Sequence, residues 1–162
     1  EDTLLGFRIQ PWRKSRNRRL VETEKFYLFD VGVANFLARR TPRIKSAEFG
    51  KAIEHLVLME LLAYKAYRQP DLDISFWRTA HKNEVDFILG EKDLAVEIKT
   101  SERIHPQDAK WLSALAEDGP VRKRVLVSFE REPKTFTDHA GEIEVLPWKV
   151  FMIRLWDGNL FA

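Results

Sequence analysis

Acidic residues and a lysine lie close together between positions 82 and 100, where their spacing could support metal-assisted hydrolysis. Asp86 lies in one apolar run, and Glu97 and Lys99 lie two residues apart in the next. Because side chains alternate between the two faces of a strand, Glu97 and Lys99 should share a face. Two carboxylates and an ammonium group on neighbouring strands are what metal-assisted cleavage of a phosphodiester requires.

Apolar residues between these charges predict the opposite, buried face of the same strand. Leu94, Val96 and Ile98 alternate with the charged positions, so we expect them to pack in the core. A carboxylate beside such a core is costly to bury unless it pairs with a cation. The charged face is therefore expected to hold an ion pair or a bound cation.

A third acid, Glu54, lies on a long helix predicted from about Ala47 to Tyr67. Apolar residues recur there at helical spacing: Phe49, Ile53, Val57, Leu61 and Tyr64. Two interpretations of Glu54 are open from spacing alone. It could join the strand acids, or it could be a solvated residue at the helix boundary, since most glutamates are exposed.

The elements that must position these residues follow an α-β-β-β-α-β order. After the long helix we expect three strands, a helix and a strand, at Ile74–Thr79, Asn83–Gly90, Leu94–Thr100, Pro106–Ala116 and Arg124–Phe129. A helix that connects two strands suggests a mixed sheet. The sequence thus predicts an α/β fold in which helices flank a mixed sheet.

Further elements are predicted on either side of this order. Residues 1–46 are expected to form an N-terminal extension, made of a β-hairpin and a short helix, ahead of a domain at 47–162. The expected elements are strands at Leu4–Ile9 and Leu20–Phe29, a helix at Val31–Arg39 with Asp30 as N-cap, an edge strand at Ile143–Leu146 and a helix from Pro147.

Composition narrows the class of protein. The 162 residues are 44% apolar and 32% charged, which fits one soluble globular domain. The absence of cysteine excludes disulfides, cysteine-ligated zinc and thiol catalysis, and it favours a cytoplasmic location. No apolar run approaches the roughly 20 residues of a membrane span, and no signal peptide is visible, so no membrane association is expected. The four histidines show no metal-ligand spacing.

A basic block near the N-terminus is a candidate nucleic-acid contact. From Thr3 to Val21 there is no acid, and the block carries a formal charge of +6 in a chain whose total is +2. Such a block can meet phosphate or an acidic partner, or it can be a solvated hairpin tip. The candidate contacts are Arg13, Lys14, Arg16, Arg18 and Arg19, together with Arg78, for which a surface salt bridge is the alternative.

The spacing of the charged residues resembles the PD-(D/E)XK nuclease superfamily. The matching positions are Glu54, Asp86, Glu97 and Lys99, and the resemblance extends over about Phe49–Phe129. Asp86 follows a valine instead of the proline that gives the superfamily its name. The resemblance implies a restriction-endonuclease-like core.

A closer resemblance covers nearly the whole chain. The chain is similar to an uncharacterised C-terminal domain that follows an AAA+ ATPase module in many bacterial and archaeal proteins. This resemblance implies that the chain is a C-terminal fragment, and that an ATPase module and a winged-helix linker precede it. The segments that carry the resemblance are Asp2–Phe7, Lys25–Val33, Trp77–Thr79, Glu84–Phe87 and Glu97–Lys99.

The resemblance also implies roles for individual residues. Asp86 and Glu97, with the Ile98 carbonyl, would bind Mg²⁺ or Mn²⁺, and Glu54 would complete the acidic cluster. Lys99 would orient or help deprotonate the attacking water and balance the phosphate charge. The function expected from this set is a divalent-metal-dependent nuclease that acts on DNA.

Two other functions are open at this point. The chain could be a catalytically inactive module that binds nucleic acid or protein and regulates the ATPase, because function lies in the site and not in the fold. It could also have a structural role as a homo-oligomer. Glu84 lies two positions before Asp86 and could face the same cleft, but it is expected to be exposed. No chemical role is assigned to Lys25 or Tyr27.

Overall fold

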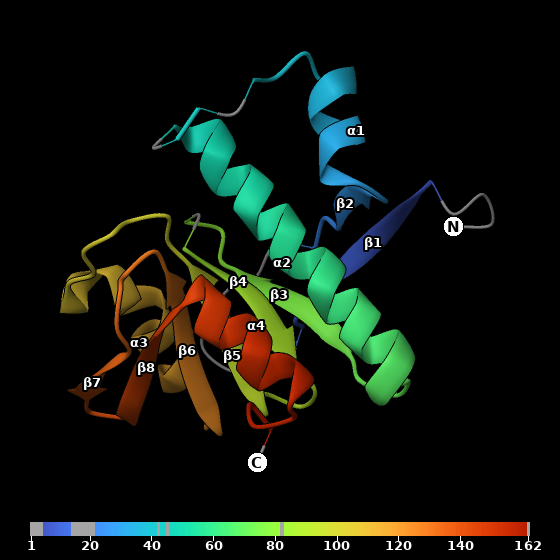
Figure 1. Ribbon diagram of the computed structural model, residues 1–162. Helices are drawn as coiled ribbons and strands as arrows, with labels where there is room; N and C mark the ends of the chain where they lie inside the picture. The colour runs from blue at the N-terminus through green and yellow to red at the C-terminus, as the bar shows by residue number, and fades with distance from the viewer. Residues whose placement is uncertain (1–4, 14–21, 42, 45, 82, 162) are drawn as a thin grey trace.

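An eight-stranded mixed sheet runs through the computed structural model of the chain, which describes residues 5–13, 22–41, 43–44, 46–81 and 83–161 (Figure 1). Its strands are β1 (Gly6–Pro11), β2 (Lys25–Leu28), β3 (Ile74–Arg78), β4 (Glu84–Leu89), β5 (Leu94–Ile98), β6 (Lys123–Ser128), β7 (Lys134–Asp138) and β8 (Gly141–Pro147). Four α-helices occur in the described part: α1 (Val31–Leu37), α2 (Ala47–Arg68), α3 (Lys110–Glu117) and α4 (Trp148–Trp156).

The central strands have the predicted order in the chain, and their pairing explains the mixed character of the sheet. Across the sheet the order is β2-β1-β3-β4-β5-β6-β8-β7. Strands β3, β4 and β5 pair antiparallel, whereas β5, β6 and β8 pair parallel. A parallel pair needs a crossover. For β5 and β6 the crossover contains α3 and the 3-10 turn Pro106–Ala109 before it.

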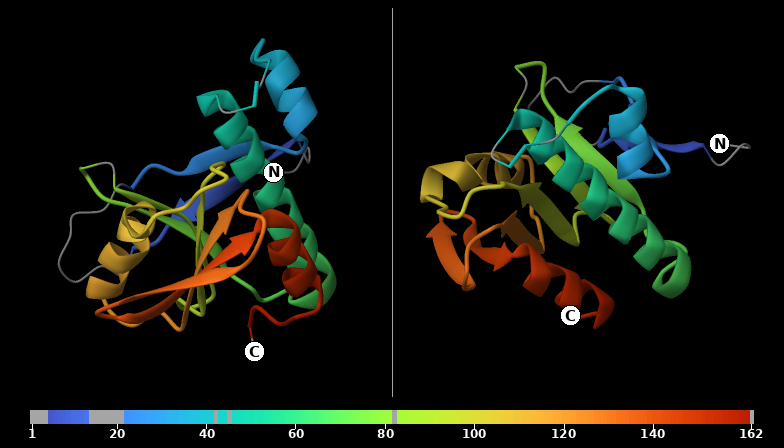
Figure 2. Two further views of the ribbon diagram at one scale, coloured as in Figure 1. Left: turned by 60° about the vertical axis from the view of Figure 1, so that its left-hand side comes forward. Right: turned by 45° about the horizontal axis from the view of Figure 1, so that its top comes forward.

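Two layers of side chains cover the two faces of the sheet. On one face α2 and α4 pack over residues that include Phe87, Leu94 and Val96, and Ile98 packs against the same cluster. This confirms the predicted core face of β5. On the opposite face α3 packs over residues that include Ile88 and Ala95. In the left view of Figure 2 the sheet separates α3 from α2 and α4.

Side-chain caps set the start of two helices. The Ser46 hydroxyl accepts a hydrogen bond from the Phe49 amide at 3.1 Å and begins α2. Asp30 accepts from the Val33 amide at 2.7 Å, so the predicted cap of the short helix is confirmed. None of the described helices is long and apolar enough to cross a bilayer.

The largest differences from the sequence-based expectation are near the C-terminus. Strand β8 is longer than the expected strand, and it lies between β6 and β7, so its prediction as an edge strand is wrong. The edge is β7, which was not predicted. It alternates half-buried and exposed residues and has few apolar side chains, so its sequence resembles a loop. Its pairing with β8, and not its composition, makes it a strand.

The N-terminal hairpin joins the main sheet. Strands β1 and β2 pair antiparallel, as expected. Within the described residues β2 covers Lys25–Leu28 of the longer predicted strand, whose first two residues, Leu20 and Val21, lie outside the described part. β1 also pairs in parallel with β3 through Gln10–Ser75 and Pro11–Phe76. This pairing holds β2 beside the N-terminal half of α2 (Figure 1), and it brings two residues of β2 into the site described below.

Burial along α2 predicts unequal effects of two leucine substitutions. Leu58 is fully buried in the core, whereas Leu56 on the same helix is 37% exposed. Leu58→Ala should lower the free energy of unfolding by roughly 2–5 kcal/mol, because it removes packed methyl groups and leaves a cavity. Leu56→Ala is the matched control and should lower it by less than about 1 kcal/mol. Urea unfolding followed by circular dichroism measures both, and equal losses would contradict the packing described.

Candidate metal centre

The site lies where β4 and β5 separate. Their pairing includes Phe87–Val96 and continues toward the turn between them, but it does not extend to Asp86. Instead, Asp86 Oδ2 accepts a hydrogen bond from the Ile98 amide at 2.8 Å. A side chain thus takes the amide that the neighbouring strand would otherwise bind, so the Asp86 carboxylate is held between the two strands.

Glu97 is the most buried acid of the site. It is 3% exposed, and its Oε1 accepts a hydrogen bond from Lys99 Nζ at 2.5 Å. This contact confirms that Glu97 and Lys99 lie on one side of β5. The other oxygen, Oε2, is buried and has no hydrogen-bond partner among the described residues. An unsatisfied buried oxygen on a carboxylate is costly, so it marks a place where a cation could bind.

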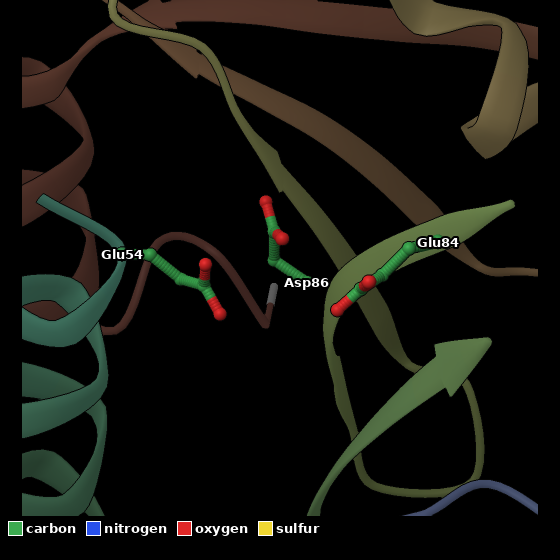
Figure 3. A group of neighbouring side chains, drawn as sticks. All are labelled: Glu54, Glu84 and Asp86. Atoms are coloured by element: carbon green, nitrogen blue, oxygen red, sulfur yellow. The ribbon is translucent and has the colours of Figure 1, made fainter. Parts of the chain in front are cut away.

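Asp86 also belongs to a cluster of three carboxylates that come from α2 and β4. Oxygens of Glu54, Glu84 and Asp86 all lie within 4.8 Å of one another. Figure 3 shows Glu54 reaching from α2 toward the two acids of β4. The expectation that Glu84 is exposed is wrong, because its side chain is half-buried in this cluster. Its two-residue spacing from Asp86 was the available signal, since such residues share a strand face.

Strand β2 supplies a cation and a hydroxyl to these acids. Lys25 Nζ donates to Glu54 Oε1 at 2.8 Å and also forms an ion pair with Glu84. The Tyr27 hydroxyl donates to the same Glu54 oxygen at 2.5 Å. Sequence reasoning gave Lys25 and Tyr27 no role. Their two-residue spacing indicates a common face, but nothing local in the sequence indicates that Glu54 faces them.

Arg78 closes the other side of the acidic cluster. Its guanidinium donates to the two Glu84 oxygens at 2.7 and 2.9 Å. The salt bridge considered for this residue is therefore present. Arg78 nevertheless keeps part of its side chain exposed and lines the same cavity as the acids. It can thus hold Glu84 and face a bound ligand at the same time.

One cavity of about 720 Å³ brings together the three acids and the lysine that were predicted from the sequence. It is lined by Glu54, Asp86, Glu97 and Lys99, and by Glu84, which was expected to be exposed. Three cations of β3, α2 and the loop before α2 also line it, namely Arg78, Lys51 and Arg40. The cavity therefore combines an acidic floor with cationic side chains, which suits a divalent cation together with an anionic ligand.

Other candidates lie elsewhere or have structural roles. Arg13 is exposed and is not part of the cavity lining. His55 lines the cavity, but its Nε2 is within 2.7 Å of the Leu28 carbonyl, which ties α2 to β2. The remaining predicted basic contacts lie outside the described residues: Lys14, Arg16, Arg18 and Arg19.

Burial and mutual repulsion shift the titration of the acids. Burial raises the pKa of Asp86 well above its ordinary value, and the charges of Glu97 and Glu54 raise it further. Burial also raises the pKa of Glu97 to about 7, although Lys99 opposes this shift. Burial would lower the pKa of Lys25, but Glu54 and Glu84 outweigh it and raise that pKa. The acids therefore favour a nearby positive charge.

The donor set fits a hard divalent cation. Each donor is a carboxylate oxygen, as Mg²⁺ and Mn²⁺ prefer, and the unpartnered Glu97 Oε2 provides a position that no protein group of the described chain satisfies.

The comparisons with known proteins identify a family without an assigned function. The family model described as "Domain of unknown function (DUF4143)" matches residues 49–151. This range contains all four sequence-predicted catalytic residues and Glu84, but it does not include Lys25 and Tyr27. No curated protein matches the chain.

The raised pKa of Glu97 predicts how the stability of the metal-free protein depends on pH. Folded Glu97 keeps its proton until about pH 7, whereas its ordinary pKa is 4.5. The folded state thus binds more protons in this range, so the free energy of unfolding should fall as the pH rises from about 4.5 to 7. The contribution of Glu97 is on the order of 3 kcal/mol. Urea unfolding in EDTA at several pH values measures it.

Two variants separate this effect from general titration. Glu97→Gln should flatten the decline, because an amide does not titrate. Glu142→Gln is the matched control, since Glu142 lies exposed on β8, and it should keep the wild-type slope. An unchanged slope in Glu97→Gln would contradict the assignment.

Proposed function

This chain belongs to the DUF4143 family of domains of unknown function, and we propose that it is a divalent-metal-dependent nuclease that hydrolyses phosphodiester bonds of DNA. The observation that carries the proposal is the buried, unpartnered oxygen of Glu97, next to Asp86 and Lys99 in one cavity. A buried carboxylate with one free oxygen is suited to binding a cation.

The proposed cofactor is Mg²⁺ or Mn²⁺. Asp86 and Glu97 would hold it with the Ile98 carbonyl, and Glu54 would stand beside it, directly or through a water molecule. A bound divalent ion supplies Lewis acidity toward the phosphate and makes a water molecule more acidic. The Asp86 carboxylate is already oriented for this task by the Ile98 amide, so binding would require little rearrangement.

Lys99 is proposed to act on the phosphate and the attacking water. In the structure its Nζ is held by Glu97, and its side chain is about one-third exposed and lines the cavity. A cation on Glu97 would weaken this ion pair and leave the ammonium free to donate to a phosphate oxygen. A positioned ammonium stabilises negative charge that develops in the transition state.

The cationic side chains of the cavity support an anionic polymer as substrate. Arg40 and Lys51 are exposed at the cavity, and Arg78 keeps about a third of its side chain accessible. Contacts of this kind bind phosphate without reading sequence. Binding should therefore weaken as salt is added.

The arrangement of elements is consistent with a restriction-endonuclease-like core of the PD-(D/E)XK type. The antiparallel β3-β4-β5 unit, the crossover through α3 and the parallel β6 support this finer assignment. We extend the proposal to an AAA+ ATPase module in the same protein, with which the nuclease would work.

A second candidate function is a binding module without catalysis. Lys25 and Arg78 already form ion pairs with Glu54 and Glu84. Acids that are neutralised in this way can stabilise the walls of the cavity without a metal ion, which favours the binding module. Such a module would bind DNA in a salt-dependent manner and would not cleave it with Mg²⁺ or Mn²⁺.

Cleavage of plasmid and oligonucleotide DNA tests the leading proposal. The wild-type chain should cut DNA with Mg²⁺ or Mn²⁺ and should be inactive in EDTA. Asp86→Ala should abolish cleavage and metal binding together. Lys99→Ala should reduce the cleavage rate about 100-fold, as expected when a charge-stabilising donor is lost, while the affinity for Mn²⁺ changes much less.

The control variant is Lys149→Ala, which removes an exposed lysine from α4 that does not line the cavity. It should cleave at the wild-type rate. Equal cleavage by wild type, Asp86→Ala and Lys99→Ala would show that the activity does not come from this site. DNA binding without cleavage in either metal would favour the second candidate function.

A further inference from the structure

We infer that the ammonium group of Lys25 takes the place of a second metal ion, so that the centre binds one divalent cation and not two. The inference rests on the metal centre of the proposed function and adds a positioning residue from β2. Lys25 lies outside the range matched by the family model.

Lys25 lies where a cation bridging the acidic cluster would lie. Its Nζ is 2.8 Å from Glu54 Oε1 and forms an ion pair with Glu84, two of the three carboxylates whose oxygens lie within 4.8 Å of one another. The lysine side chain is only 13% exposed. A buried ammonium between two carboxylates does what a bridging metal ion does electrostatically, because it offsets their repulsion.

Tyr27 gives a second donor to the Glu54 oxygen that Lys25 contacts. Its hydroxyl donates to the same Glu54 oxygen as Lys25. Glu54 Oε1 thus accepts two hydrogen bonds. A metal ion on that oxygen would have to displace both donors.

The Asp86–Glu97 side of the cavity is different. Asp86 Oδ2 accepts a hydrogen bond from a backbone amide, and Glu97 Oε2 accepts none from the described residues. Lys99 contacts the other oxygen of Glu97. The protein therefore supplies its own cation on the Glu54–Glu84 side and leaves an oxygen free on the Asp86–Glu97 side.

The formal charges agree with a single ion. Within the described residues, three cationic side chains form ion pairs with acids of the site: Lys25, Arg78 and Lys99. The acids are Glu54, Glu84, Asp86 and Glu97. With all of them ionised, the group has one net negative charge. One divalent ion makes it mildly positive, which suits a phosphate, and a second ion would leave a large uncompensated positive charge.

Calorimetric titration with Mn²⁺, combined with electron paramagnetic resonance, tests this inference without any substrate. Wild type should bind one Mn²⁺ in the cavity. Lys25→Met removes the ammonium but keeps a long side chain, and it should bind two ions with the spectrum of a coupled Mn²⁺ pair. Lys25→Arg keeps the charge and should bind one ion. Lys149→Met is the matched control, since Lys149 is exposed on α4 and does not line the cavity, and it should also bind one.

The outcomes separate the inference from the proposed function. Two ions in the wild type would overturn the role of Lys25, whether or not the variant folds. One ion in both the wild type and a folded Lys25→Met would overturn it as well. No ion in the wild type and one in Lys25→Met would show that the Lys25 ammonium occupies a cation position, which supports its role. The same result would overturn the metal centre of the proposed function. No ion in any protein would overturn both.

Discussion

The separation of β4 and β5 beyond the Phe87–Val96 pair is the constraint on which the site depends. If the ladder continued, Asp86 and Glu97 would be ordinary members of a strand pair, and the amide of Ile98 would have a backbone partner. Because it stops, Asp86 takes that amide. The opening also lets α2, which covers one face of the sheet, and α3, which covers the other, line one cavity with Glu54 and Trp111 respectively.

Gathering acids at this opening creates repulsion that the rest of the fold has to offset. The N-terminal hairpin offsets this repulsion, although it is distant from the acids in sequence. Strand β1 pairs with β3 and with β2, and β2 places Lys25 against Glu54 and Glu84. The hairpin is therefore part of the sheet, and it also supplies a positive charge to the site. The contact of His55 with the Leu28 carbonyl fixes the same strand to α2 and keeps Lys25 in register with the acids.

The sequence analysis predicted the parts of the fold that local patterns determine. Alternation along β5 correctly separated Leu94 and Val96 from Glu97 and Lys99, and helical spacing located α2 to within a residue at its C-terminal end. Glu84 was misassigned, because its burial depends on Lys25, which is distant in sequence. Strand β7 was missed for a related reason, since it is a strand by virtue of its partner β8. Local spacing placed Glu84 on the face of Asp86, but nothing local identified Lys25 as its partner or β8 as the partner of β7.

A contrast within the site supports the proposed cation-binding centre over a salt-bridge network. In a purely structural network every carboxylate has its own partners, as Glu84 does between Lys25 and Arg78. Glu97 is more deeply buried than Glu84 and has fewer partners, since Lys99 contacts one oxygen and no described residue contacts the other. Burial makes such a deficit more costly, not less. Both oxygens of the more exposed Glu84 have partners, whereas the more buried Glu97 has a partner at one oxygen only. A cation bound at the other oxygen of Glu97 would complete this arrangement.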